Sequence, residues 1–148
     1  MARILITDDD RVVRATMSYL LGTKGHDVVE AASGREGLAR IASEHFDLLI
    51  VDIFMPDMDG LETIKRVLNH DPALPILVVS GMGARSASGS TGPPDFLAMA
   101  TKLGAVQSLR KPFRAREFLT AVEDCLNIRG VEDNLQADHG QGTFKNSA

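Results

Sequence analysis

The chain has 148 residues, a net charge of -4 and 44% hydrophobic side chains, which is enough for one domain with a buried core. The acidic balance disfavours nucleic-acid binding, which needs a concentrated positive face, and the single cysteine, Cys125, excludes an internal disulfide and a cysteine-based zinc cluster. No apolar run approaches the ~20 residues that span a bilayer, and residues 1–4 carry no signal-peptide pattern, so we expect a cytoplasmic protein without membrane insertion.

The chain begins with a short strand and an amphipathic helix. Residues 4–7 form a β-rich run that ends in three consecutive aspartates. Apolar residues then recur at three- and four-residue steps, which predicts a helix with Asp10 as its N-cap and Gly22 and Gly25 as its C-terminal stop. The expected buried stripe of this helix consists of Val12, Val13, Thr16, Met17, Leu20 and Leu21.

A second strand and helix follow, and then the stretch around which the chain is organised. Residues 28–29 predict a strand, and Ser33 with Glu36 fits a capping box that opens a helix carrying Leu38 and Ile41. Residues 47–52 predict a buried third strand, because the run is short, apolar and β-branched. That strand ends on a carboxylate, Asp52, ahead of the turn-forming residues 56–60.

The second half predicts three helices and two more strands. A helix is expected over residues 61–70, then a strand over residues 76–79 that ends at Ser80. Residues 81–94 are rich in Gly, Ser and Pro and predict a long flexible loop. The remaining expectations are a helix from Pro93 to Leu103 with Gly104 as its cap, a weak strand over 105–109, a helix over 114–128, and a polar, disordered tail over 130–148.

Five alternations of strand and helix predict an α/β fold, a doubly wound parallel sheet with helices on both faces. The carboxyl ends of parallel strands share one edge of a sheet, and ligands bind there. Five polar residues stand at or just after such ends: Asp8, Asp9, Asp52, Ser80 and Lys111. A single acid could simply begin a turn, but this convergence predicts a functional site.

The convergent residues have the chemistry of phosphoryl transfer. Two carboxylates ~4 Å apart repel by about 4 kcal/mol at an effective dielectric of 20, so the cluster needs a cation, a proton or a salt bridge. An open set of oxygen ligands suits Mg²⁺, and a lysine adds a point charge for phosphate. Asp52 is then the candidate nucleophile, since carboxylates form aspartyl phosphates. The four histidines lack ligand spacing and are expected to be solvated: His26, His45, His70 and His139.

Residues 2–128 resemble the receiver domains of two-component response regulators. The resemblance rests on five features: Asp8-Asp9, Asp52 with Met55-Pro56-Asp57-Met58-Asp59-Gly60, Ser80 with Gly81, Gly104-Ala105, and Lys111-Pro112-Phe113. It implies a CheY-like, flavodoxin-like strand order of 2-1-3-4-5 and a receiver domain over residues 1–129. It also implies a cis Lys111-Pro112 bond.

The resemblance further assigns roles to the site. Asp52 is the expected phosphoacceptor, Ser80 holds a switch hydroxyl and Lys111 contacts the phosphoryl group. The expected Mg²⁺ ligands are Asp9 directly, Asp8 through water, Asp52, and the backbone carbonyl of Phe54. The expected partners are a histidine kinase or histidine phosphotransfer protein, which donates the phosphoryl group, and an unidentified downstream protein.

Because no output domain is expected after residue 128, we interpret the chain as a stand-alone receiver that signals by partner docking or phosphorelay. It would not be an enzyme, although it catalyses its own phosphorylation and slow dephosphorylation; Phe54, bulky and two residues after Asp52, would hinder the attacking water. A phosphohydrolase of the haloacid dehalogenase type is disfavoured because it needs an acid at the position of Phe54.

One position departs from the family pattern. Three residues before the lysine, where an aromatic side chain is usual, stands Ser108. The aromatic half of the usual switch is therefore missing, and an alternative interpretation is a degenerate receiver that binds partners without phosphorylation. We hypothesise instead that phosphorylation still occurs and orders the loop over residues 81–94, which hydrogen exchange would detect. The alternative for this loop is a passive insertion.

Overall fold

The computed structural model describes residues 1–54, 60–81, 100, 102, 104–105 and 107–128. The turn after Asp52, nearly all of the loop over residues 81–94, most of the fourth expected helix and the tail lie outside these residues. None of the helices in the described part of the chain combines the length and hydropathy that a bilayer span requires.

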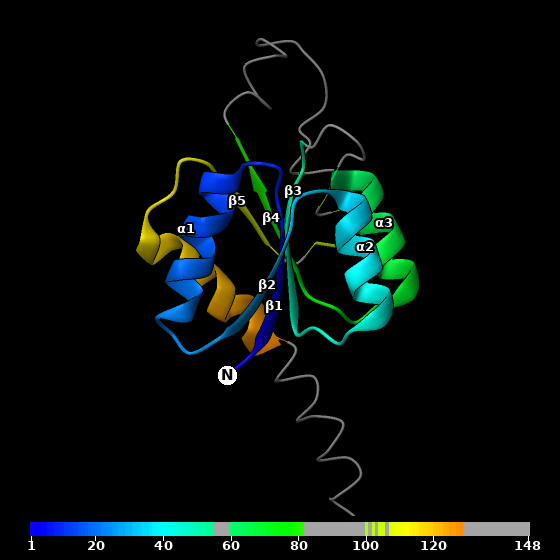
Figure 1. Ribbon diagram of the computed structural model, residues 1–148, viewed down its shortest axis with the longest axis horizontal. Coiled ribbons are helices and arrows are strands. Elements are labelled where there is room, and N and C mark those ends of the chain that lie inside the picture. Colours follow the sequence, from blue (N-terminus) through cyan, green and yellow to red (C-terminus); the bar gives the residue numbers. More distant parts are fainter. Residues whose placement is uncertain (55–59, 82–99, 101, 103, 106, 129–148) are drawn as a thin grey trace, which may run out of the picture.

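The fold is a five-stranded sheet in which every pair of neighbours is parallel, in the order β2-β1-β3-β4-β5 (Figure 1). This confirms the predicted α/β class and the order that the family resemblance implied. The strands are β1 (Arg3–Thr7), β2 (Asp27–Ala31), β3 (Leu48–Asp52), β4 (Ile76–Ser80) and β5 (Gln107–Arg110).

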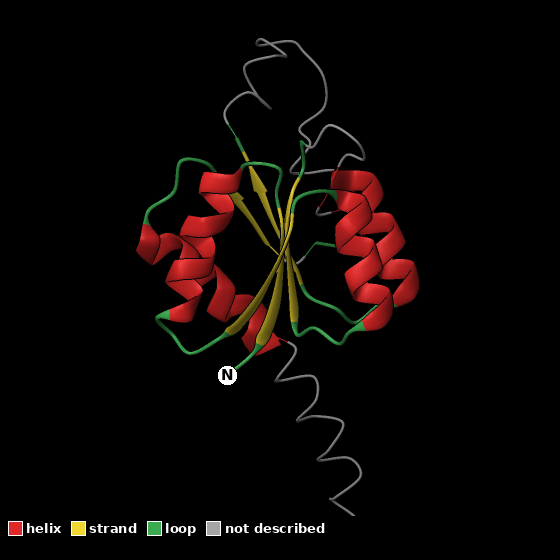
Figure 2. Ribbon diagram, viewed as in Figure 1, coloured by secondary structure: helices red, strands yellow, loops and turns green. Residues whose placement is uncertain are grey.

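Helices cover both faces of the sheet (Figure 2). The described helices are α1 (Arg11–Gly22), α2 (Gly34–Ser43), α3 (Gly60–His70) and an unlabelled helix over residues 115–128. In Figure 1, α1 and the helix over 115–128 lie on one side of the sheet, and α2 and α3 lie on the other.

The two hydrophobic cores follow from the alternation of side chains along the central strands. Ile4, Ile6, Leu48 and Ile50 pack with Met17 and Leu21 of α1 and with Phe118 and Cys125 of the last helix. The alternate residues Leu5, Leu49 and Val51 pack with Ile41 of α2 and with Ile64 and Val67 of α3. Because both faces are covered, β3 and β4 are buried at every position, as their unbroken apolar sequences predicted.

The predicted helix starts are present. The Asp10 side chain accepts hydrogen bonds from the N–H groups of Val12 and Val13, and the Ser33 side chain accepts one from the N–H of Glu36. The Glu36 carboxylate returns to the N–H of Ala32 rather than to Ser33, so the capping box is shifted by one residue. Gly25 has a positive φ of 82°, which glycine adopts without strain.

Three local expectations were wrong. Val12 is 73% exposed and Thr16 is also exposed, because only the Met17 and Leu21 side of α1 contacts the sheet. The fifth strand begins at Gln107 and ends at Arg110, later than predicted. His26 is half-buried rather than solvated: its Nδ1 accepts a hydrogen bond from the N–H of Ala2 at 3.1 Å, and burial lowers its pKa.

Candidate phosphoacceptor site

Three carboxylates meet at the carboxyl edge of the sheet. One side-chain oxygen from each of Asp8, Asp9 and Asp52 lies within 4.8 Å of the others. Asp8 is fully buried, Asp52 is 5% exposed and Asp9 is exposed. The cluster thus has a protein side, formed by Asp8 and Asp52, and an open side at Asp9.

Strand register explains why these acids converge. Thr7 pairs with Val51 across β1 and β3, so the next residues, Asp8 just after β1 and Asp52 at the end of β3, stand at the same level. The Asp8 carboxylate is fixed locally, because its Oδ1 accepts a hydrogen bond from the N–H of Asp10 at 2.8 Å. Asp52 is held in the same way: its Oδ1 accepts a hydrogen bond from the N–H of Phe54 at 3.2 Å.

Lys111 reaches across the sheet to the two buried acids. Its Nζ lies 2.7 Å from Asp8 Oδ2 and 3.5 Å from Asp52 Oδ2. The turn after β5 brings it there, since the Lys111 N–H donates a hydrogen bond to the Ser80 carbonyl at 2.6 Å. The Lys111-Pro112 bond is cis, as the resemblance implied. Burial alone would lower the pKa of Lys111, but the hydrogen bond to Asp8 and the charges of both acids outweigh it and raise that pKa.

One ammonium group does not fully compensate three carboxylates. Burial raises the pKa of Asp52 to about 6, an effect that Lys111 opposes and that the Asp8 charge reinforces. Asp52 therefore sits where its ionised form is disfavoured and where an additional cation would stabilise it.

The donor set fits a small, hard divalent cation. Carboxylate oxygens are the ligands that Mg²⁺ prefers, and the exposed Asp9 leaves room for water in the coordination shell. The Phe54 carbonyl stays a prediction as a ligand, and the N–H of the same residue donates a hydrogen bond to Asp52.

Ser80 ends β4, next to the strand that carries Asp52. Asp52 pairs with Val79, so Ser80 stands one residue further along the same edge. Ser80 is buried, and its hydroxyl donates a long hydrogen bond of 3.4 Å to the Gly81 carbonyl. Ser108, the residue that replaces the usual aromatic, lies in β5 opposite Val78 and is exposed.

An open apolar surface adjoins the carboxylate cluster. A pocket of about 350 Å³ borders Lys111 and is lined by Val12, Val13, Thr16, Lys111, Pro112 and Phe113. It shares Val12 and Thr16 with a second pocket of about 580 Å³ that extends along α1 to Tyr19, whose side chain is 72% exposed. The sequence pattern does not predict this surface, because it places Val12 and Thr16 on the buried stripe of the helix.

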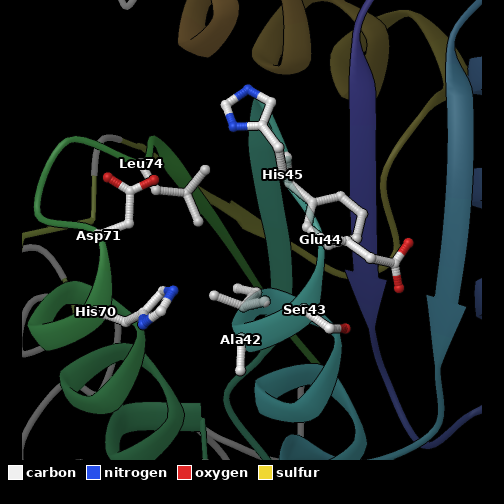
Figure 3. A pocket seen from close by; sticks show the side chains of 9 residues that line it. Ala42, Ser43, Glu44, His45, His70, Asp71 and Leu74 are labelled. Carbon is white, nitrogen blue, oxygen red and sulfur yellow. The ribbon is translucent and has the colours of Figure 1, made fainter.

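Another pocket lies at the opposite edge of the sheet. It has a volume of about 390 Å³, and α2 and α3 end beside it (Figure 3). His45, which follows α2, and His70, which ends α3, both line it, as do Phe46 and Leu74. No three metal-ligating side chains meet there, since the acid cluster is the one such group found among the described residues.

The chain matches a known family along most of its length. The sequence model of the response regulator receiver domain matches residues 4–123. The response regulator MprA of Mycobacterium ulcerans is 34% identical over 145 residues, which cover 96% of this chain and 57% of that protein. The DNA-binding transcriptional regulator NtrC of Azospirillum brasilense is 32% identical over 140 residues, 95% of this chain and 27% of that protein.

Solved structures give the same result. A CheY-like response regulator receiver domain protein from Methanospirillum hungatei JF-1 superposes with a TM-score of 0.77 at 30% identity, covering 89% of this chain and 98% of that one. NtrX from Brucella abortus superposes with a TM-score of 0.80 at 25% identity, covering 92% of this chain and 29% of that one. The chain thus spans about half, or less, of the curated relatives named above.

Proposed function

The chain belongs to the response regulator receiver domain family, and on this premise we propose that Asp52 accepts a phosphoryl group from a phosphohistidine. The observation that carries the proposal is the cluster of Asp8, Asp9 and Asp52 with Lys111 Nζ at 3.5 Å from Asp52. Asp52 is the member that ends a central strand and contacts Lys111 less closely than Asp8 does, so it is the acid freer to react.

In the proposed step, a carboxylate oxygen of Asp52 forms a bond to phosphorus while the bond from phosphorus to the donor's imidazole nitrogen breaks. The bonding electron pair stays on the imidazole, and the product is an aspartyl phosphate. The Lys111 ammonium would turn from Asp52 towards the new phosphoryl oxygens, and the Ser80 hydroxyl would donate a hydrogen bond to one of them.

The three acids would also hold Mg²⁺. Asp9 and Asp52 are the proposed direct carboxylate ligands, with the Phe54 carbonyl beside them, and Asp8 acts through water while it anchors Lys111. The bound ion would supply positive charge that offsets the charge on the transferring phosphoryl group. A single ammonium group beside three carboxylates supports this proposal, because the site has an uncompensated negative charge.

The phosphodonor, a histidine kinase or histidine phosphotransfer protein, would dock on the outer face of α1. Val12 and Tyr19 are large apolar side chains left exposed there, and the pocket that both line shares Val12 with the pocket that borders Lys111. Exposed apolar patches of this kind are typical of protein interfaces. A donor seated on α1 would lie beside the acid that it phosphorylates.

We propose that the phosphorylated domain acts by changed docking to a downstream protein or by passing the phosphoryl group on. The Ser80 hydroxyl would be the part of the site that senses the phosphoryl group. Contact with nucleic acid is not part of this proposal, because this chain has a net charge of -4. One relative, NtrC, is named as a DNA-binding regulator, but this chain covers only 27% of that protein.

Intact-protein mass spectrometry after incubation with acetyl phosphate tests the proposal. One phosphate should add to the protein in the presence of Mg²⁺, and chelation or the Asp52→Asn substitution should abolish the addition. If the wild type gains no phosphate with Mg²⁺ present, the phosphoacceptor function is wrong and a phosphorylation-independent binding module takes its place.

A further inference from the structure

Arg14 connects α1 to the backbone of the acidic loop. Its Nη1 donates a hydrogen bond to the Asp8 carbonyl at 2.7 Å, and its Nε lies 3.3 Å from Glu30 Oε1 on β2. Glu30 is itself anchored, because its other oxygen accepts a hydrogen bond from the Ser18 hydroxyl at 2.7 Å. The Arg14 side chain is 14% exposed and that of Glu30 is 40% exposed, so the network is buried at its arginine end and open to solvent at Glu30.

The network needs an arginine at this position. Arg14 and Ser18 are one helical turn apart on α1, so both reach the same carboxylate on the neighbouring strand. A guanidinium group has five N–H donors in a rigid fork and can serve the Asp8 carbonyl and Glu30 at once. A lysine ammonium at the same position would be a single point charge on a flexible stem.

The peptide group joining Asp8 to Asp9 is the part of the acidic loop that Arg14 holds. The preceding peptide is held as well, because the Asp8 N–H donates a hydrogen bond to the Ala31 carbonyl at 3.2 Å, and the Asp8 carboxylate is fixed by Asp10 and Lys111. Asp9 is the exposed member of the cluster, so the direction of its side chain depends chiefly on that peptide plane.

We propose that Arg14 is a positioning residue for the cation site. By fixing the Asp8–Asp9 peptide, it holds Asp9 at the distance from Asp52 that a shared Mg²⁺ requires. The inference rests on the proposed function, because it assumes that the acid cluster binds Mg²⁺. Groups that orient ligands in this way change metal affinity although they do not touch the metal.

Two other roles for Arg14 give different results. If Arg14 acted on the site only through its positive charge, its removal would relieve repulsion and tighten Mg²⁺ binding. If it served only the packing of α1, its removal would lower stability without changing the Mg²⁺ affinity of the folded protein. The positioning role alone predicts weaker Mg²⁺ binding by a protein that is still folded.

The test is titration calorimetry of the full chain with Mg²⁺, in parallel with thermal unfolding in chelator. Arg14→Gln should weaken Mg²⁺ binding about tenfold, the lower end of the usual effect of losing a group that orients a metal ligand. Arg14→Lys should recover less than half of the lost Mg²⁺ affinity, because lysine keeps the positive charge but lacks the forked N–H donors of the guanidinium group. Arg66→Gln is the matched control, since Arg66 pairs with Glu62 on the exposed side of α3. The Mg²⁺ affinity of this variant should equal that of the wild type.

A second readout separates positioning from chemistry. In the reaction with acetyl phosphate, Arg14→Gln should raise the half-saturating Mg²⁺ concentration by the same factor and change the rate at saturating Mg²⁺ less. Unchanged or tighter binding in Arg14→Gln overturns the inference and leaves the phosphoacceptor function standing. If Arg14→Gln does not fold, Arg14→Lys and Glu30→Gln are measured in its place. Wild-type Mg²⁺ affinity in both of these variants would overturn the positioning role of Arg14. A wild type that binds no Mg²⁺ overturns the proposed function as well.

Discussion

At the scale of single residues, the burial of Asp52 imposes an electrostatic cost on the fold. The residue is 5% exposed, and its carboxylate lies 3.5 Å from one ammonium and close to two further acids. With a pKa of about 6, the group is more easily protonated in the folded chain than in the unfolded one. Near neutral pH its ionised form therefore opposes folding, by on the order of 3 kcal/mol.

Asp52→Asn should consequently stabilise the metal-free protein, in a pH-dependent way. The raised pKa means that wild-type Asp52 destabilises the fold above about pH 6, and that this loss disappears as pH falls towards the unfolded pKa of ~4. In chelator, Asp52→Asn should raise the midpoint of thermal unfolding at pH 8, and should raise it only about a third as much at pH 4.5. The exposed Asp124→Asn is the control; an equal gain at both pH values for Asp52→Asn would contradict the account.

Phe54 is predicted to slow the loss of the phosphoryl group. Its ring is partly exposed two residues after Asp52, and its N–H holds the Asp52 carboxylate, a contact that alanine would keep. Phe54→Ala should therefore shorten the lifetime of the phosphorylated protein, followed by intact mass after removal of acetyl phosphate. Tyr19→Ala, on the outer face of α1, is the control and should leave the lifetime unchanged. An unchanged lifetime in Phe54→Ala would contradict the predicted role of Phe54.

At the scale of elements, the start of α3 packs against the backbone at the end of β3. The Gly60 N–H donates a hydrogen bond to the Ile53 carbonyl at 2.7 Å. A Cβ at position 60 would lie 2.5 Å from both the Asp52 carbonyl oxygen and the Ile53 Cα. Only glycine allows α3 to approach the end of β3 so closely, which links the packing of this helix to the position of Asp52.

Gly60→Ala should therefore destabilise the protein, by about 1–3 kcal/mol, the usual cost of overpacking. The clash is with backbone atoms, so it cannot be relieved by a change of rotamer. Gly22→Ala at the end of α1 is the control, because no atom lies within 4 Å of its added Cβ, and it should be neutral or slightly stabilising. Urea unfolding of both variants measures the difference, and equal midpoints would contradict this account of α3.

The helix α1 has one face buried against the sheet and one exposed apolar face. Met17 and Leu21 anchor it to the sheet, whereas Val12 and Tyr19 project from the opposite side. If the donor docks there, Tyr19→Ala should lower kcat/KM for transfer from a phosphorylated histidine phosphotransfer protein about tenfold, since buried interface aromatics often contribute more than 1 kcal/mol.

The same variant should react with acetyl phosphate at the wild-type rate, because that donor needs no docking surface. Ile128→Ala, which removes an exposed apolar side chain from the end of the last helix, is the control for the protein donor. Equal losses with both donors would mean that Tyr19 supports the site itself rather than docking.

At the scale of the whole molecule, the fold could be predicted because each central strand reads as an unbroken apolar run, which a sheet covered on both faces requires. The gathering of Asp8, Asp9, Asp52 and Lys111 followed from strand ends alone. The strand order came from family resemblance, since periodicity does not say which strands are neighbours.

The features of the site that the sequence pattern does not predict depend on tertiary contacts. The contact between Lys111 and Asp8 joins residues 103 positions apart, and the network of Arg14, Glu30 and Ser18 joins a helix to a strand that follows it. Val12 has the spacing of a core residue, but the sheet covers only one side of α1 and leaves it exposed. Periodicity identifies the apolar face of a helix and does not say how much of that face is covered.

The central claim is that, of three acids gathered at one edge, Asp52 alone accepts the phosphoryl group. Borohydride reduces an aspartyl phosphate to homoserine, so peptide mapping of the reduced, phosphorylated chain identifies the acceptor directly. The account predicts homoserine at position 52, dependent on Mg²⁺ and on prior phosphorylation. Homoserine at position 8 or 9, or phosphate that resists reduction and maps to another side chain, would contradict it.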